Sequence, residues 1–412
     1  MVRLDLSNQG LAVLPPIPAD VTILVCNDNN LTALPDLPAG LIELACYRNK
    51  LTTLPVLPAG LTNIHCNFNK LLALPNLPAG LTKLWCSVNK LTELPALPAG
   101  LTELECGTNN LSELPALPAG LTELSCYSNP LMELPNLPAG LKSILCSKNQ
   151  LTELPALPTG LTGLHCYNNQ LTRLPELPAG LTTCSCQNNR LTTLPDLPFT
   201  LENLWCANNQ LTRLPNLTDN LRSVRCDYNQ LTELPALPAE LTDLYCNDNQ
   251  LTELPALPFG LDDFMCYNNQ LTKLPDLPEE LRQFDCSNNR LTELPDLPYN
   301  LEYINSADNL LPPELDAIFD EYIEDLEQLA ISVNHYNAEK RRRANIRQAG
   351  RETATLRSIL PALPGNTFRA NDPFSKTLRN LKRNHNSYGP RRQRKTYRKK
   401  RKSNRRKTRR HK

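Results

Sequence analysis

The sequence of 412 residues lacks any run of about 18 apolar residues, so it predicts no membrane-spanning helix. Aromatic side chains make up only 5% of the chain, and histidine occurs five times. Because histidine is a common general base and metal ligand, this scarcity leaves little material for either kind of site. The first twenty residues lack the basic, apolar and small-residue segments of a secretory signal. We therefore expect an intracellular protein of a reducing compartment, with free thiols.

Charge is distributed unevenly along the chain. Residues 1–300 contain 16 basic and 30 acidic residues, a net charge of −14. The last 37 residues contain 19 basic residues and no acidic one. An acidic body and a basic tail of this kind are interpreted as separate functional parts.

A period of twenty residues runs from the first residue to about residue 310. Each unit reads Leu-Thr-x-Leu-x-Cys-x-x-Asn-x-Leu-Thr-x-Leu-Pro-x-Leu-Pro-x-x, numbered below as positions 1 to 20. Apolar positions 4 and 6 alternate with polar positions 3, 5 and 7, as in a short strand with one buried face. One unit cannot bury that face alone, so neighbouring units must stack. The pattern predicts a leucine-rich-repeat solenoid with a parallel concave sheet.

Two further features of the unit predict its local structure. The two prolines of Leu-Pro-x-Leu-Pro remove backbone donors and favour extended geometry, so the convex side should be polyproline-like rather than helical. Asparagine at position 9, from Asn29 to Asn309, is expected to pair its amide with backbone groups at the turn after the strand.

Cysteine recurs at position 6 of fourteen consecutive units, from Cys26 to Cys286, and Cys184 stands outside this series. Between inward-pointing leucines, cysteine serves as a small hydrophobe. Disulfides between units fit poorly, because in-register strands hold equivalent Cβ atoms ~4.8 Å apart with parallel vectors. A row of metal ions would need thiolates and mixed ligands, whereas leucine surrounds these positions. We interpret the cysteines as structural and expect no metal and no cofactor.

The variable positions 3, 5, 7 and 8 are predicted to face the concave side. Nine of the fourteen aromatic residues in residues 1–300 fall there. A solvated strand face has no packing need for tryptophan, whereas interfaces are enriched in Trp, Tyr and Met. The alternative is that these surface positions vary freely and that aromatics suit strands. The candidate partner-binding residues are Tyr47, His65, Phe68, Trp85, Tyr127, His165, Tyr167, Trp205, Tyr228, Tyr245, Met265 and Tyr267.

No catalytic residue is assigned in these repeats. His65 and His165 lie five units apart, too far to cooperate in one reaction. A cluster of Glu103, Glu105 and Glu123 is interpreted as a solvated acidic face. We therefore predict that the protein is not an enzyme.

The composition predicts a division into the solenoid (1–310), a helical C-terminal cap (311–364) and a disordered basic tail (365–412). Apolar residues at helical spacing predict one helix that covers the open end of the sheet, with a partner-binding helix as the alternative. These apolar residues are Leu315, Phe319, Tyr322, Leu326, Leu329 and Val333.

The basic tail is expected to attract a nuclear-import receptor, nucleic acid, anionic lipid or an acidic protein surface, which includes the acidic repeats themselves. Few aromatic residues interrupt it, which disfavours sequence-specific binding. The candidate localisation or nucleic-acid-binding residues are Arg391, Arg392, Arg398, Lys399, Lys400, Arg401, Lys402, Arg405, Arg406, Lys407, Arg409 and Arg410.

The unit LTGLHCYNNQLTRLPELPAG at residues 161–180 resembles the LPX-type leucine-rich repeats of secreted bacterial effectors, the IpaH and YopM class. The resemblance covers about residues 1–310 and implies a protein that binds host signalling proteins through its repeats. Some members carry a ubiquitin-ligase domain with a Cys-x-Asp motif. No cysteine follows Cys286, and residues 311–412 are too few and too basic for that domain, so ligase activity is not implied. The helical cap that such effectors place before their repeats is also absent.

The preferred hypothesis is a non-enzymatic interaction protein that modulates host signalling in the cytoplasm or nucleus, with the tail setting its location. The rival hypothesis is a nucleic-acid-associated or virion-packaged protein that binds through its tail. A tail rich in Lys, Arg, Thr and Tyr resembles those of large DNA virus proteins, which is consistent with the rival.

Overall fold

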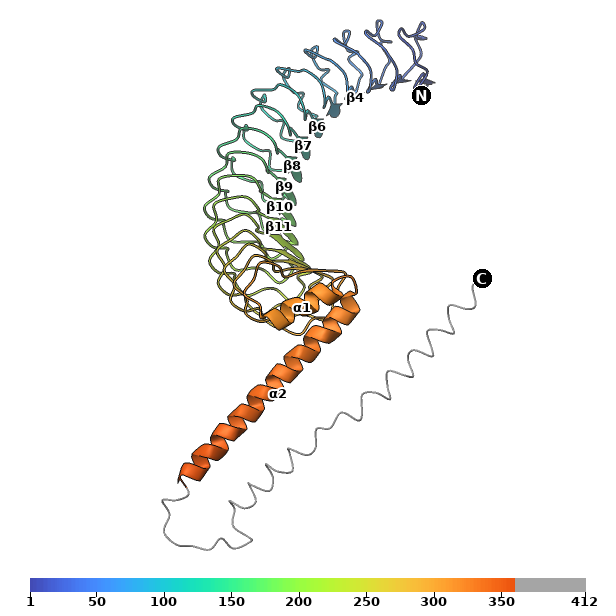
Figure 1. The fold of residues 1–412 in the computed structure, drawn as a ribbon. Helices are drawn as coiled ribbons and strands as arrows, with labels where there is room; N and C mark the ends of the chain where they lie inside the picture. The colour runs from blue at the N-terminus through green and yellow to red at the C-terminus, as the bar shows by residue number, and fades with distance from the viewer. Residues whose placement is uncertain (360–412) are drawn as a thin grey trace, which may run out of the picture. The chain divides into compact units, whose positions relative to one another are not determined.

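The computed structural model describes residues 1–359 (Figure 1). Sixteen parallel strands of three residues, one in each twenty-residue coil, form one sheet in chain order. Each strand carries the number of its coil. The strands are β1 (Arg3–Asp5), β2 (Ile23–Val25), β3 (Glu43–Ala45), β4 (Asn63–His65), β5 (Lys83–Trp85), β6 (Glu103–Glu105), β7 (Glu123–Ser125), β8 (Ser143–Leu145), β9 (Gly163–His165), β10 (Thr183–Ser185), β11 (Asn203–Trp205), β12 (Ser223–Arg225), β13 (Asp243–Tyr245), β14 (Asp263–Met265), β15 (Gln283–Asp285) and β16 (Tyr303–Asn305).

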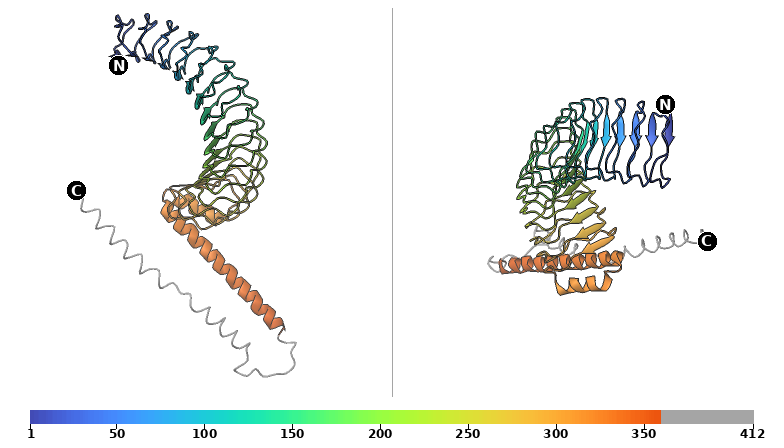
Figure 2. Two further views of the ribbon diagram at one scale, coloured as in Figure 1. Left: turned by 180° about the vertical axis from the view of Figure 1, so that it is seen from behind. Right: turned by 90° about the horizontal axis from the view of Figure 1, so that it is seen from above.

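The coils follow an arc whose inner side is lined by the strands (Figures 1 and 2). The segments that return along the outer side contain neither helix nor strand. Both observations confirm the predicted leucine-rich-repeat solenoid with a concave parallel sheet and a non-helical convex side.

Every strand pairs in register with the equivalent strand of the next coil. Leu164 in β9, for example, lies opposite Cys184 in β10, which lies opposite Leu204 in β11. The ladder continues one residue past the strand, because the Cys146 amide donates to the His165 carbonyl at 2.9 Å. Equal positions of successive coils therefore form continuous rows of side chains.

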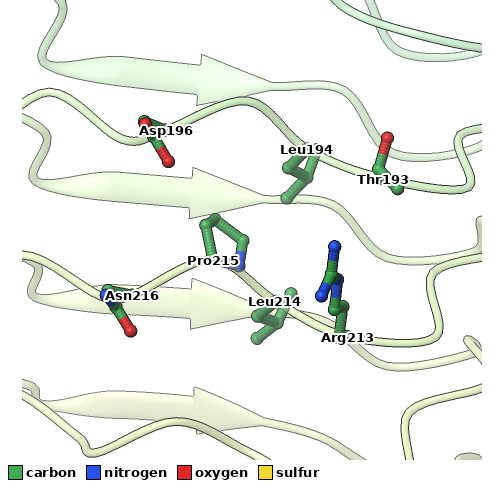
Figure 3. A pocket seen from close by; sticks show the side chains of 7 residues that line it. All are labelled: Thr193, Leu194, Asp196, Arg213, Leu214, Pro215 and Asn216. Carbon is green, nitrogen blue, oxygen red and sulfur yellow. The ribbon is translucent and has the colours of Figure 1, made fainter.

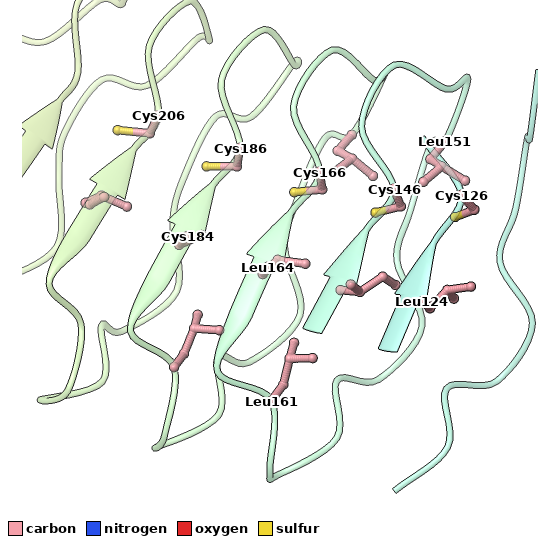
Figure 4. Close-up of a cluster of buried hydrophobic side chains, with 14 of the residues drawn as sticks. Leu124, Cys126, Cys146, Leu151, Leu161, Leu164, Cys166, Cys184, Cys186 and Cys206 are labelled. Carbon is pink, nitrogen blue, oxygen red and sulfur yellow. The ribbon is translucent and has the colours of Figure 1, made fainter. Parts of the chain in front are cut away.

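The core consists of the inward-facing rows. In coils 3 to 15 the residues at positions 1, 4, 6 and 11, such as Leu161, Leu164, Cys166 and Leu171, have almost no exposed surface. All fifteen cysteines are buried with free thiols, as predicted, and the labelled sulfur atoms in Figure 4 lie in a row beside the leucines. Sulfur fills the space of a small apolar group here.

The asparagine at position 9 bridges adjacent coils. Asn109 donates from Nδ2 to the carbonyls of Cys86 and Cys106 at 3.1 and 3.0 Å. Its Oδ1 accepts from the Leu91 amide at 3.0 Å. The same set of bonds recurs along the solenoid, for example at Asn289. The predicted amide-to-backbone pairing is confirmed.

Two helices, rather than the single predicted helix, cover the C-terminal end of the sheet. They are α1 (Pro313–Tyr322) and α2 (Leu326–Ile359). The break falls before Asp325, whose carboxylate accepts from the Gln328 amide at 3.1 Å and so caps the start of α2.

Residues of both helices pack into the core, since Leu315, Leu329 and Val333 are buried. Asn334 of α2 also pairs with coil 15, because its side chain accepts from the Leu297 amide and donates to the Leu297 carbonyl. The predicted capping role of this region is confirmed.

Residues Met1–Glu339 form one compact unit, and the described residues from 340 to 359 do not belong to it. Residues 340–359 continue α2. The expected boundaries at residues 310 and 364 stay a prediction, and the basic tail lies outside the described residues.

Substitution of Asn109 by alanine should lower the free energy of unfolding by about 2–4 kcal/mol, because buried backbone groups of two coils lose their partners. Urea denaturation followed by circular dichroism measures the change. Asn216→Ala, at an exposed asparagine of the return segment, is the control and should change little. Equal effects of the two substitutions would contradict the bridging role.

The stability of the solenoid should fall steeply above about pH 9. Burial raises the pKa of the Cys106 and Cys146 thiols from 9.0 to about 12. The unfolded chain therefore releases these protons at lower pH than the folded chain, so the stability is full below pH 9 and is lost as pH rises toward 12. Each thiol contributes a slope of about 1.4 kcal/mol per pH unit.

Urea denaturation at several pH values between 8 and 11 tests this dependence. The double variant Cys106→Ala and Cys146→Ala should show a slope that is shallower by about 3 kcal/mol per pH unit. A slope that does not change on removal of the two thiols would count against the burial argument.

Candidate functional site

The concave surface is built from positions 3, 5, 7 and 8 of successive coils. In each strand the residues at positions 3 and 5 flank a buried residue at position 4, so their side chains leave the opposite face of the sheet. In-register pairing then places His65 beside Trp85, and Trp205 beside Arg225. All twelve candidate residues occupy these rows, and their binding role stays a prediction.

The first group of candidates, in coils 3 to 5, consists of Tyr47, His65, Phe68 and Trp85. His65 and Trp85 stack with ring centroids 4.0 Å apart and an interplanar angle of 20°. Half-burial in this stack lowers the pKa of His65, which favours the neutral imidazole. Phe68 is 48% exposed, with the Arg48 guanidinium 5.5 Å from its ring centroid. This group offers a largely apolar surface.

The second group lies in coils 7 to 9 and consists of Tyr127, His165 and Tyr167. The Tyr127 ring lies across Gly107 of the preceding coil, where a Cβ atom would come within 2.4 Å of the ring. Burial lowers the pKa of His165, which sits opposite the exposed Leu145 of β8. The absence of a side chain at Gly107 therefore determines how Tyr127 lies on the surface.

The third group lies in coils 11 to 14 and contains Trp205, Tyr228, Tyr245, Met265 and Tyr267. Trp205 donates from Nε1 to the Ser223 hydroxyl at 3.3 Å. The Arg225 guanidinium lies 4.5 Å from the centroid of the Tyr245 ring. Tyr245 donates its hydroxyl to Asp263 at 3.1 Å. Polar neighbours from adjacent coils therefore hold the aromatic rings of Trp205 and Tyr245 in place.

Burial and the nearby groups Tyr228 and Asp248 raise the pKa of Tyr267 to about 12. Tyr267 consequently stays a neutral hydrogen-bonding phenol at physiological pH. The tyrosines of the third group are bound into a network and are not isolated surface residues.

An acidic zone separates the first two groups. Glu103 pairs with Lys83 at 2.6 Å. Burial, with the neighbouring Glu103 and Glu123 carboxylates, raises the pKa of Glu105. The twelve residues thus form three groups along the arc and not one patch. His65 and His165 lie in strands β4 and β9, five strands apart in the sheet, as the sequence predicted.

Position 8 has an unusual backbone that the sequence pattern did not reveal. In every coil this residue has a positive φ, between 51 and 57°. Asparagine and aspartate tolerate this left-handed conformation best. They are common at this position and form side-chain bonds between coils, as from Asn208 to Asn188 at 2.6 Å. Phe68 and Tyr228 hold the same conformation at a steric cost, with exposed side chains.

The aromatic pattern also missed the polar partners of the third group. Arg225, Asp263, Asp285 and Tyr303 all lie in the concave rows and contact one another or the candidate tyrosines. Because positions 3 and 5 of successive coils stack in register, the sequence could have predicted which polar residues lie beside the tyrosines. Charged residues on this face therefore belong to the site.

A separate hollow lies between the return segments of coils 10 and 11 (Figure 3). It is away from the strand residues that carry the aromatic groups. Its lining residues are Thr193, Leu194, Asp196, Arg213, Leu214, Pro215 and Asn216. Their polar groups are one carboxylate, one guanidinium, one hydroxyl and one amide.

Residues 1–359 contain neither a metal-binding cluster nor a membrane-spanning helix. No three or more His, Cys, Asp or Glu side chains in this range are arranged to hold a metal ion. No helix in the same range has the length and apolar character needed to cross a membrane. The basic residues predicted at 391–410 lie outside the part of the chain that the structure describes.

Several solved structures of leucine-rich repeat proteins are similar to this chain. YopM from Yersinia enterocolitica WA-314 is 36% identical with a TM-score of 0.69, covering 76% of this chain and 79% of that chain. YopM from Yersinia pestis, a leucine-rich effector protein, is 37% identical with a TM-score of 0.68, covering 74% and 88%. The functional domain of InlJ from Listeria monocytogenes, which includes a cysteine ladder, is 29% identical with a TM-score of 0.50, covering 62% and 64%. No protein-family model and no curated protein sequence matches the chain.

Replacement of Phe68 by asparagine should raise the free energy of unfolding by about 1 kcal/mol, because asparagine is better suited to the left-handed backbone. The reciprocal change Asn168→Phe, at the same position of coil 9, should lower it by a similar amount. Chemical denaturation of both variants measures the two effects. A loss of stability in Phe68→Asn would show that packing of the phenyl ring outweighs the backbone strain.

Proposed function

The chain belongs to the family of bacterial leucine-rich repeat effectors that includes YopM, and we propose that it is a non-enzymatic scaffold that binds a protein partner through its concave face. The observation that carries the proposal is that Trp, Tyr, Phe, His and Met side chains stand in the concave rows, in three groups along the sheet. Trp and Tyr are enriched among the residues that contribute most binding energy at protein interfaces, and Phe and Met are enriched in interface cores.

The proposed setting is the interior of a host cell, where the protein would modulate a signalling protein. Fifteen free thiols are consistent with a reducing compartment. The basic residues at 391–410 would direct the protein to the nucleus or hold it at an anionic surface. The location and the class of partner are thus proposed in addition to the family relationship.

The buried thiols support a function without covalent chemistry. Burial raises the pKa of Cys26 and Cys66 to about 12, and every cysteine is enclosed in the core. Because the thiolate is the reactive form, these side chains are poor nucleophiles at neutral pH. The proposal therefore assigns them to packing.

A second candidate function comes from the 19 basic residues among the last 37. Such a segment would bind nucleic acid through phosphate contacts, as in a nucleic-acid-associated or virion-packaged protein. This binding would weaken steeply between about 50 and 200 mM salt, whereas an aromatic interface would change little.

Affinity capture from cell extract tests the two functions, with the full chain as bait at physiological salt under reducing conditions. The triple variant Trp85→Ala, Tyr167→Ala and Trp205→Ala should lose a protein partner that the unsubstituted chain captures. Its control is the triple variant Phe199→Ala, Phe259→Ala and Tyr299→Ala, which removes three exposed aromatic residues from the turns before the strands. Thermal melting verifies that both variants are folded.

Capture by the control variant and loss in the concave variant would support the proposal. Equal capture by all three baits would refute the concave site. Recovery of nucleic acid alone, with a strong dependence on salt, would establish the second candidate function.

A further inference from the structure

The concave rows of coils 12 to 16 carry charge of almost one sign. Their single basic residue is Arg225. Arg282 and the acidic residues that it contacts, Asp262 and Glu302, lie outside these rows at position 2. The carboxylates in the rows are Asp227, Asp243, Asp248, Asp263, Asp285 and Asp308. This part of the sheet is therefore an acidic surface with few cations of its own.

Arg225 shows how a guanidinium is held on this surface. Its Cζ atom lies 4.5 Å from the centroid of the Tyr245 ring, within the range of a cation–π contact. Tyr245 in turn donates to Asp263 of the next coil at 3.1 Å. The ring, on a surface that is otherwise acidic, therefore provides a seat for a planar cation.

The same pair of groups recurs two coils further without an arginine. Tyr303, which is 44% exposed, donates its hydroxyl to Asp285 at 3.1 Å. Asp285 is itself buried and also accepts from Asn305 and Ser287, so the open feature here is the ring. Among the described residues, no guanidinium lies over this ring. Tyr228, which is 53% exposed, offers a second open ring beside Tyr267, and Asp248 also lies near Tyr267.

Arg225 is the only cation within these rows to offset their carboxylates. Burial, and then the neighbouring Asp243 and Asp262 carboxylates, raise the pKa of Asp263. Burial also raises the pKa of Asp227, and a backbone hydrogen bond and the nearby Arg225 offset only part of that shift. A cation that arrives from outside would be favoured here.

We propose that the concave face of coils 12 to 16 binds an arginine-rich segment of the protein partner, with guanidinium groups over the open rings of Tyr228 and Tyr303. Arginine is favoured over lysine because its planar, weakly hydrated group both stacks on a ring and pairs with a carboxylate. The inference rests on the proposed function, since it names the chemistry of the partner.

The spacing of the two rings sets the length of the segment. Tyr228 is at position 8 of coil 12 and Tyr303 at position 3 of coil 16, so four strand spacings of ~4.8 Å along the sheet and five residues of ~3.3 Å across it place them about 25 Å apart. An extended peptide covers this distance with about eight residues at ~3.3 Å each. Arginines separated by about that number of residues can therefore occupy both seats.

Fluorescence anisotropy with the full chain tests the inference, using a labelled Gly-Arg repeat peptide and a matched Gly-Lys repeat peptide. The arginine peptide should bind at least about threefold more tightly than the lysine peptide. The double variant Tyr228→Asn and Tyr303→Thr should bind the arginine peptide about tenfold more weakly. Asparagine suits the left-handed backbone and threonine suits a strand, so both substitutions preserve the fold.

Tyr299→Ser is the matched control, because Tyr299 is 58% exposed in the turn before β16 and outside the concave rows. Its affinity should be that of the unsubstituted chain. Equal affinity for the two peptides, or unchanged binding in the double variant, would overturn the inference. Binding that emerges only after the arginines of residues 376–412 are replaced by glutamine would make the chain's own segment the occupant and would also overturn it.

The two proposals fail separately. A chain that ignores the arginine peptide but captures a protein through Trp85, Tyr167 and Trp205 would retain the proposed function and lose only this inference. A chain that binds the peptide through Tyr228 and Tyr303 but captures no protein would have the recognition surface without the proposed scaffold role.

Discussion

Backbone hydrogen bonding at the turn after each strand is the constraint on which the solenoid depends. A strand of three residues satisfies few of its coil's peptide groups, and the return segments form no helix. The asparagine at position 9 supplies hydrogen bonds for the remaining groups. The side-chain amide of Asn109, for example, binds carbonyls of two coils and the backbone amide of Leu91 in the preceding coil. Buried polar groups left without partners would each cost about 1–3 kcal/mol, so the solenoid cannot leave them unpaired in every coil.

This bridging also explains the character of the concave surface. Each coil must repeat the position of its neighbour closely for the asparagine to reach both, so the strands stay in register along the whole sheet. Residues at equal positions consequently stack on one another. Favourable stacks such as His65 on Trp85 and unfavourable rows of aspartate both follow from this geometry. The chemistry of the surface is decided by pairs of residues twenty positions apart.

The periodic part of the fold could be predicted from the sequence because each feature depends on one position of the unit. Burial of Cys166, pairing of Asn109 and the absence of helix in Leu-Pro-x-Leu-Pro are local consequences that every coil repeats. Features that depend on two different residues were harder to predict. The place of Tyr127 follows from Gly107 in the preceding coil, and the seat at Tyr245 needs both Arg225 and Asp263. Periodicity also failed at the break between α1 and α2, where the Asp325 cap interrupts an apolar pattern that continues through it.

Because equivalent coils stack in register, distances along the sheet are whole multiples of one strand spacing. A coil contacts the coils beside it, so the gain or loss of twenty residues adds or removes one strand and leaves the internal bonds of every other coil in place. The separation between the aromatic groups is thus a whole number of coils, and it can change only in steps of one strand spacing, ~4.8 Å. Duplication and deletion of units would then select partners by the distance between their contact points, while point substitutions in the concave rows would tune the chemistry of each contact.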